Sequence, residues 1–290
     1  MDCDKKILDD IRIALKEDGV KADITTKLFV PAQKTTKAVL VAKEDCVVCG
    51  LDVLRLVLKI MDKNIEFKSV KRDGDFIKKG GKIACIKGKA RFILGAERVM
   101  LNYICFLSGI ATMTRRYVQA VKPYNTKILD TRKTIPGLRL LEKYAVKTGG
   151  GYNHRMNLNE MILIKDNHLE AVGGFSGVEK ILKQHPNIRK YKIELEVKNL
   201  KELGQALLLN PDIIMLDNMN LADMKRAVII RNKFSLSRSD LRPKLEASGG
   251  ITLENIKKIS ACGVDMISVG ALTHSVKSID MSLEFRPYHK

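Results

Sequence analysis

The stretch from Lys127 to His168 reads KILDTRKTIPGLRLLEKYAVKTGGGYNHRMNLNEMILIKDNH, and it decides the fold. It contains two short apolar runs, Ile128–Leu129 and Met161–Ile164, and a charged segment follows each run at once. Between the runs, the spacing of apolar residues predicts a helix over residues 138–147, which glycines end. A strand, a helix and a second strand in this order are typical of parallel α/β proteins.

Cationic side chains gather directly after the two apolar runs of this stretch. Arg132 and Lys133 follow the first run, Lys165 follows the second, and His154 and Arg155 stand between them beside the glycines. Strand ends carry the active site in α/β barrels, so these cations predict a ligand with several negative charges. An unpaired charge next to a buried strand is costly, which favours this interpretation. The other cations lie on the predicted helix and are interpreted as solvated surface: Arg139, Lys143 and Lys147.

Strands and helices continue to alternate towards the C-terminus. Fewer than eight clear strands can be counted, so a closed eight-stranded barrel is not indicated. Alternation of this kind predicts parallel strands joined by right-handed crossovers. The further strand-like runs are Lys192–Val197, Asp212–Leu216, Lys244–Ala247 and Met266–Val269, and helices are predicted over 177–184, 200–209, 221–230 and 253–260.

The residues before Lys127 follow a different pattern. Short strands with glycine turns and one amphipathic helix predict an α+β sandwich. Two helices, over 96–109 and 110–121, are expected to come next. The predicted organisation is therefore an N-terminal sandwich domain over 1–110 and a barrel domain over 111–275, with the tail 276–290 returning to the first domain.

Two carboxylates stand at predicted strand ends, Glu196 in IELEV and Asp217 in MLDNM. Glu194 has the same parity as Glu196, so both could point into the barrel. Acids in such places accept hydrogen bonds from sugar hydroxyls or hold Mg²⁺. The alternative is that each acid only pairs with a nearby lysine.

Two successive small-residue turns follow the last two predicted strands. Ser248, Gly249 and Gly250 form the first turn, and the second runs from Gly270 to His274. Turns of this kind aim backbone N–H groups at a phosphate, helped by the dipole of the following helix. Glycines needed only for tight turning are the alternative, which is less satisfactory for two such turns in succession.

Composition narrows the class of protein. The formal net charge is +19 and the pI is near 9.6, which suggests nucleic-acid binding. Against that, the lysines are spread along the whole chain, and no RNA-binding or zinc-finger signature is present. The six cysteines lack the spacing of a disulfide framework and are interpreted as reduced thiols. The charged N-terminus does not resemble a signal peptide, and no apolar run predicts a membrane span, so we expect a cytoplasmic protein.

The segments DTRKT-x-PGLR, KYAVKTGGGYNHR and LIKDNH, in this order, resemble the quinolinate phosphoribosyltransferase family. The resemblance extends through AERVMLNYICFLSGIAT, LDNM, SGGIT and SVGALTHS, and so covers nearly the whole chain. It implies an incomplete, seven-stranded α/β barrel with an N-terminal α+β sandwich domain. It also implies a homodimer, or a hexamer built from dimers, with shared active sites.

The resemblance further implies the reaction and the site. Phosphoribosyl pyrophosphate and quinolinate would give nicotinate mononucleotide, pyrophosphate and carbon dioxide, with Mg²⁺ as cofactor and neither nucleic acid nor membrane as partner. Lys133, Lys165, Glu196 and Asp217 would be catalytic, and the two acids would hold the metal. Quinolinate would bind to Arg98 of a second subunit, Arg132, His154, Arg155 and Lys165. Phosphoribosyl pyrophosphate would bind to Lys133, Glu196, Asp217, Ser248, Gly249, Gly250, Gly270 and His274.

Three alternatives stay open from the sequence. A related phosphoribosyltransferase could act on nicotinate or another acidic base without decarboxylation. A basic nucleic-acid-binding protein would account for the net charge. A molybdate-transport-associated paralogue would share the motifs.

Overall fold

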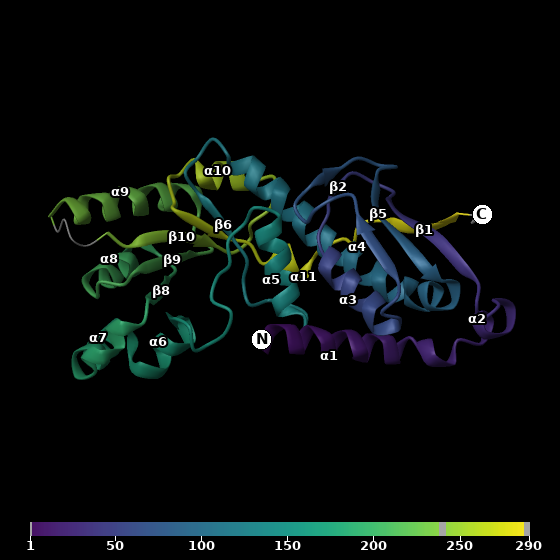
Figure 1. Cartoon of the computed structure of the whole chain (residues 1–290). Coiled ribbons are helices and arrows are strands. Elements are labelled where there is room, and N and C mark those ends of the chain that lie inside the picture. The colour runs from purple at the N-terminus through teal and green to yellow at the C-terminus, as the bar shows by residue number, and fades with distance from the viewer. Residues whose placement is uncertain (1, 238–241, 287–290) are drawn as a thin grey trace. The chain divides into compact units, whose positions relative to one another are not determined.

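The computed structural model describes residues 2–237 and 242–286 (Figure 1). The chain divides into two compact units, each made of several segments. Unit 1 comprises residues 1–115, 135–150 and 275–290, and unit 2 comprises residues 116–134 and 151–274. This division differs from the expected ranges, because residues 135–150 lie within the predicted barrel stretch and yet belong to unit 1. The end of the expected tail, residues 287–290, lies outside the described part of the chain.

Unit 1 is built on an antiparallel sheet with the order β12-β1-β5-β3. The C-terminal strand β12 pairs with six of the eight residues of β1, from Lys37 opposite Arg286 to Ala42 opposite Met281. β1 is buried from Ala38 to Ala42, so it forms the centre of this core. The strands are β1 (Thr35–Ala42), β3 (Glu66–Ser69), β5 (Lys82–Lys89) and β12 (Met281–Arg286), with a small pair β2 (Cys46–Val47) and β4 (Phe76–Ile77), and the helices before α4 are α1 (Asp2–Glu17), α2 (Ile24–Phe29) and α3 (Leu51–Met61).

Helix α4 (Ala90–Val121) is one helix of 32 residues, where the sequence predicted two. Ser108 and Gly109, taken as an interruption, lie inside it. The Ser108 hydroxyl accepts the Cys49 N–H at 3.0 Å, and a Cβ at Gly109 would lie 2.5 Å from the Lys277 carbonyl oxygen. Close packing therefore explains the small residues, and the helix does not break. By length and composition α4 could cross a membrane, but more than half of its apolar window is buried inside the protein.

Helix α5 (Arg139–Thr148) contacts other segments of unit 1. The Tyr144 hydroxyl donates to Asp73 Oδ2 at 2.8 Å, and Arg115 donates to the Gly149 carbonyl oxygen at 3.0 Å. The interpretation of Lys143 as solvated is wrong, because its side chain is fully buried. Glu142 beside it is buried too and accepts the Ile135 N–H at 3.0 Å. The face of α5 that carries Glu142 and Lys143 is therefore buried, although charged residues predicted a face exposed to solvent.

Unit 2 contains a six-stranded parallel sheet with the order β6-β11-β10-β9-β8-β7. Every strand predicted after Lys127 is confirmed to within one or two residues. A short helix, α6, was not predicted. The strands are β6 (Lys127–Leu129), β7 (Ile162–Ile164), β8 (Ile193–Val197), β9 (Ile213–Asp217), β10 (Lys244–Ser248) and β11 (Met266–Ser268), and the helices are α6 (Asp166–Val172), α7 (Gly174–Gln184), α8 (Leu200–Leu208), α9 (Leu221–Ser237), α10 (Ile256–Ser260) and α11 (Ala271–His274).

This parallel sheet curls into an incomplete barrel. Tyr152 forms an isolated parallel bridge with Leu129 and so lies beside the edge strand β6. His154 follows Tyr152 closely, yet its Nε2 is 3.0 Å from Glu194 of β8, near the opposite edge of the sheet. The two edges can meet in this way only if the sheet is strongly curved. In the described part of the chain this sheet has six strands, and Tyr152 adds one isolated bridge beside β6, so the seven strands implied by the resemblance are not confirmed.

Candidate active site

A cavity of about 460 Å³ lies at the carboxyl ends of the unit 2 strands. Its wall brings together cations, acids and hydroxyls that are far apart in the sequence. Most of the residues expected at the site therefore line a single cavity. The lining residues are Thr131, Arg132, Lys133, His154, Arg155, Leu163, Lys165, Asp166, Asn167, Glu196, Met215, Asp217, Ser248 and Ser268.

Asp130 anchors the cationic side of this cavity. It follows β6 directly and is fully buried. Its Oδ1 accepts the His154 N–H at 2.8 Å, and its own N–H donates to the Tyr152 carbonyl oxygen at 3.1 Å. The aspartate therefore ties the segment after β6 to the segment that carries His154. Sequence reasoning missed this residue, although an acid directly after a buried run is a usable signal.

Arg155 presents an incompletely satisfied guanidinium to the cavity. Its Nη1 donates to the Met161 carbonyl oxygen at 2.8 Å, whereas its buried Nε has no hydrogen-bond partner within the described part of the chain. Burial lowers the pKa of Arg155, the positive charge of Arg132 lowers it further, and Glu194 works in the opposite direction. Two cations held together in this way favour an anion between them.

The contacts of the His154 ring were not predicted from the sequence. Its Nδ1 accepts the Arg155 N–H at 2.8 Å, and its Nε2 lies 3.0 Å from Glu194 Oε2. Both ring nitrogens thus face protein groups. The geometry favours a supporting position for His154 over direct contact with a ligand.

The acidic side of the cavity is formed by Glu196 at the end of β8 and Asp217 at the end of β9. Burial raises the pKa of Glu196, the nearby charge of Asp217 raises it further, and Lys165 lowers it. Asn218, with φ at 52°, donates from Nδ2 to Asp217 Oδ1 at 3.0 Å and orients that acid. Two close carboxylates suit a divalent cation bound to oxygen ligands. Asn218 was missed in the sequence, although it belongs to the LDNM segment.

The first small-residue turn depends on its glycine. Gly249 has φ at +90°, and a Cβ there would lie 2.2 Å from Asn218 Oδ1. The turn therefore lies against the residue that orients Asp217. Only glycine combines this backbone conformation with such a close approach.

The second turn closes on the cationic loop. A Cβ on Gly270 would lie 2.9 Å from His274 Nε2 and 3.3 Å from Lys133 Cδ. The Thr273 hydroxyl donates to the Lys133 carbonyl oxygen at 2.7 Å. The helices after the two turns are short, α10 with five residues and α11 with four, so the helix dipole contributes less than expected.

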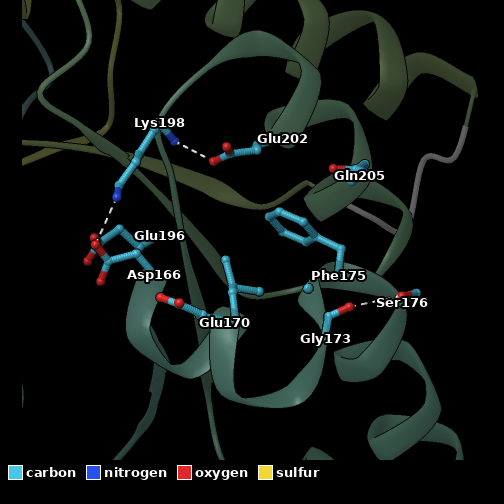
Figure 2. A pocket seen from close by; sticks show the side chains of 11 residues that line it. Asp166, Glu170, Gly173, Phe175, Ser176, Glu196, Lys198, Glu202 and Gln205 are labelled. Carbon is cyan, nitrogen blue, oxygen red and sulfur yellow. Dashed lines mark hydrogen bonds and ion pairs between the residues drawn. The ribbon is translucent and has the colours of Figure 1, made fainter.

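A second cavity of about 460 Å³ adjoins the first and shares Asp166 and Glu196 with it (Figure 2). Lys198 spans one side of this cavity. Its Nζ forms an ion pair with Asp166 Oδ2 at 2.8 Å, and its backbone N–H donates to Glu202 at 2.8 Å. Of the remaining expected residues, Arg98 lies exposed on α4 in unit 1.

Models of two known protein domains match this chain. Residues 110–284 match the family model of the quinolinate phosphoribosyl transferase C-terminal domain, and residues 23–108 match that of its N-terminal domain. The chain belongs to the quinolinate phosphoribosyltransferase family. The barrel and sandwich expected from the resemblance are thereby confirmed as this family's architecture.

Relatives of the family match almost the whole chain. A probable nicotinate-nucleotide pyrophosphorylase (carboxylating) from Methanocaldococcus jannaschii is 43% identical over 96% of this chain and 96% of its own length. The nicotinate-nucleotide pyrophosphorylase (carboxylating) of Mycobacterium leprae is 42% identical over 95% and 96% of the two chains. The solved structure of the nicotinate-nucleotide pyrophosphorylase from Francisella tularensis superimposes with a TM-score of 0.87 at 40% identity, covering 97% and 96%.

Proposed function

We propose that this chain transfers the phosphoribosyl group of phosphoribosyl pyrophosphate to quinolinate, with decarboxylation. Family membership supports the reaction. One structural observation supports the assignment of this reaction to the cavity at the strand ends of unit 2. Arg132, Arg155 and Lys165 line the same cavity as Glu196 and Asp217. A pyridine diacid and an activated sugar phosphate need cations and acids in one place, and this cavity offers both.

The two arginines are assigned to the quinolinate carboxylates. The buried Nε of Arg155 is a ready donor, and the Arg132–Arg155 repulsion is relieved when a dianion binds. A guanidinium fork matches a carboxylate bidentately, which a lysine cannot do. Lys165, at the start of α6, is assigned to the same substrate or to the departing pyrophosphate.

The acids are assigned to the ribose and the metal. Glu196 and Asp217 accept hydrogen bonds from the ribose hydroxyls, and they are the residues that would hold Mg²⁺. Their mutual repulsion fits that cation. When bound, Mg²⁺ stabilises negative charge on the pyrophosphate group. Ser248, Gly249, Gly250, Gly270 and His274 are assigned to the 5′-phosphate.

The chain's own residues then promote the reaction. The cavity wall orients the pyridine nitrogen towards the anomeric carbon, and the bond to pyrophosphate breaks through an oxocarbenium-like state. Lys133, held beside Gly270 and His274, neutralises charge that develops on the leaving group. The ring nitrogen becomes cationic on transfer, and this promotes loss of the neighbouring carboxylate as carbon dioxide.

Two further features belong to this proposal. A homodimer, alone or within a hexamer, would complete each site with Arg98 of a second copy. A cytoplasmic location fits a biosynthetic enzyme that acts on soluble acids.

The deciding experiment is conversion of quinolinate and phosphoribosyl pyrophosphate to nicotinate mononucleotide, with carbon dioxide release measured from labelled quinolinate. Activity is expected to need Mg²⁺, and nicotinate is expected to be a poor acceptor. Turnover with nicotinate but not with quinolinate would establish the non-decarboxylating alternative instead.

Substitution of the loop lysines tests the assignment of the site. Lys133→Ala and Lys165→Ala are each expected to reduce kcat by about 10²–10³-fold, the usual effect of losing a preorganised donor. Lys201→Ala, which removes an exposed lysine of α8, is the matched control and should leave kcat unchanged. Near-normal turnover in both loop variants would place the chemistry elsewhere.

A further inference from the structure

Two fully buried glutamates lie close to His154 and have no role in the assignment above. Glu194 is in β8 and Glu246 is in β10, two strands away, and neither side chain is exposed. His154 meets both of them: its Nε2 is 3.0 Å from Glu194 Oε2 and 3.8 Å from Glu246 Oε1. Burial of two acids is unfavourable unless they serve polar partners. The imidazole of His154 is the partner that they share.

The hydrogen bonds of this imidazole fix its protonation pattern. Nδ1 accepts the Arg155 N–H at 2.8 Å and so carries no proton. The proton of the neutral ring is therefore on Nε2, the nitrogen beside Glu194, although the two groups are not aligned as a hydrogen bond. A carboxylate in this position selects one tautomer and one ring orientation, as carboxylates do for other functional histidines.

Arg155 depends on that orientation. Its backbone N–H is held by Nδ1 of His154, and its Nη1 is held by the Met161 carbonyl oxygen. The backbone N–H of His154 is in turn held by Asp130. If the ring of His154 turns, Arg155 loses one of its two anchors while its buried Nε stays without a partner.

We infer that Glu194 and Glu246 are positioning residues for the acidic ring substrate: they fix the imidazole of His154, and His154 fixes Arg155 for pairing with a carboxylate. The inference rests on the proposed function, since Arg155 must bind the diacid. Glu194 makes the close contact, and Glu246 restricts the ring from the other side. His154 itself lines the cavity, and through Arg155 it acts on the substrate carboxylate.

The glutamate variants give the direct test, and the quantity measured is the Kd of quinolinate for the full chain by calorimetry. Glu194→Gln keeps a polar oxygen beside Nε2, so its Kd is expected within about threefold of the wild type. Glu194→Leu fills the same space without an acceptor, and a misplaced Arg155 is expected to weaken quinolinate binding about tenfold or more. The KM for phosphoribosyl pyrophosphate should change less than about twofold in both variants, because the sugar site does not depend on Arg155.

A comparison of ligands separates positioning from general damage. Arg155 serves a carboxylate, so Glu194→Leu should reduce the preference for quinolinate over nicotinate, whereas loosening of the whole cavity would weaken both acids equally. Equal effects of Gln and Leu, or an unchanged preference, would overturn the inference. A divalent metal ion that binds stoichiometrically to the wild type and is lost in Glu194→Leu would also overturn the inference. The side chains of His154, Glu194 and Glu246 place donor atoms within 4.8 Å of one another and could hold such an ion.

Variants of His154 give a second test if Glu194→Leu does not fold. The Oδ1 of an asparagine can replace Nδ1 as acceptor of the Arg155 N–H, so His154→Asn should weaken quinolinate binding less than His154→Leu does. If both variants weaken it equally, the inference fails. Wild-type conversion of quinolinate is measured alongside: its absence would refute the proposed function, whereas its presence with unchanged variants would refute only the positioning role.

Discussion

At the scale of single residues, the backbone conformation of Gly249 lets the turn approach Asn218, which orients the assigned acid Asp217. With φ at +90° and Asn218 Oδ1 only 2.2 Å from the position of an added Cβ, Gly249→Ala must strain the turn and displace Asn218. We expect a loss of about 1–3 kcal/mol of unfolding free energy and a raised KM for phosphoribosyl pyrophosphate. Denaturant unfolding and steady-state kinetics measure the two effects.

Gly204 supplies the matched control. It lies in α8, and no atom comes within 4 Å of the position of an added Cβ. Gly204→Ala is expected to stabilise the protein by about 0.5–1 kcal/mol, because alanine loses less conformational entropy in a helix. If both alanine variants destabilised equally, the packing argument for Gly249 would be refuted.

The buried acid Glu246 makes stability depend on pH. Burial, and after it the charge of Glu194, raise its pKa from an ordinary 4.5 to about 8, with His154 working in the opposite direction. Between these pH values the unfolded chain has released a proton that the native chain keeps. The free energy of unfolding therefore falls as pH rises through this window, by up to about 1.4 kcal/mol per pH unit, and the native acid ionises at its upper end.

Glu246→Gln should remove this contribution. The unfolding free energy of Glu246→Gln minus that of the wild type is expected to increase as pH rises from about 5 to about 8. The exposed residue Glu254 provides a control, and Glu254→Gln should follow the wild-type pH curve. Parallel curves for the wild type and Glu246→Gln would show that the buried acid is ionised throughout.

At the scale of elements, one ion pair fixes α9 to the sheet. Arg231 is 2% exposed, and its Nη1 donates to Asp265 Oδ2 at 2.8 Å and to the Pro243 carbonyl oxygen at 2.9 Å. The same Asp265 oxygen accepts the Leu245 N–H. Arg231→Ala leaves these acceptors without a cation and is expected to cost about 3 kcal/mol of unfolding free energy. Arg226 on the same helix is 70% exposed and 3.8 Å from Asp223, so Arg226→Ala should change it by less than about 0.5 kcal/mol in the same denaturation assay.

The elements also show what local patterns can predict. Most of the short strands after Lys127 were predictable because they are apolar runs bounded by polar residues, whereas in β8 (IELEV) acidic residues alternate with apolar ones. The helix α6 was not, since its seven residues begin within LIKDNH and are held by a cap from His168 to the Lys165 N–H. The continuity of α4 depends on packing at Gly109, which no local pattern contains.

The features of the candidate site also divide into those that local sequence patterns predict and those that they do not. Arg132, Lys133, Lys165 and Asp217 were predictable from their places at the ends of apolar runs, Arg155 from the glycines before it and Glu196 from its place near a strand end, and one cavity unites these residues. The contact of His154 with Glu194 and Glu246 was not, since it joins opposite edges of a curved sheet.

At the scale of the whole molecule, the chain passes between unit 1 and unit 2 more often than the predicted order of strands and helices suggests. The strand–helix–strand pattern around residues 135–150 predicted a helix of the barrel, yet this segment belongs to unit 1. Its side chains explain why, because Tyr144 bonds Asp73 and Lys6 donates to the Gly137 carbonyl oxygen at 2.9 Å. Such partners are distant in sequence and carry no local signal.

The shared site proposed for Arg98 has a consequence at this same scale. The proposed homodimer assigns Arg98, an exposed arginine early in α4, to the cavity of a second copy. Arg98→Ala and Lys133→Ala chains should each be nearly inactive alone. In a two-fold dimer formed after mixing and subunit exchange, half of the dimers are mixed, and each mixed dimer has one intact site. Activity should therefore return to about a quarter of the wild-type value.

A variant pair within one site provides the control for this complementation. Mixing Lys133→Ala with Lys165→Ala chains leaves a damaged residue in every site, because both lysines line the cavity of their own chain. No activity should return in that mixture. Recovery there would mean that the two lysines of one site come from different chains. No recovery with Arg98→Ala would mean that each chain builds its site alone, and the excess of positive charge around Arg132 and Arg155 would then have to be balanced by the substrate without help from a second copy.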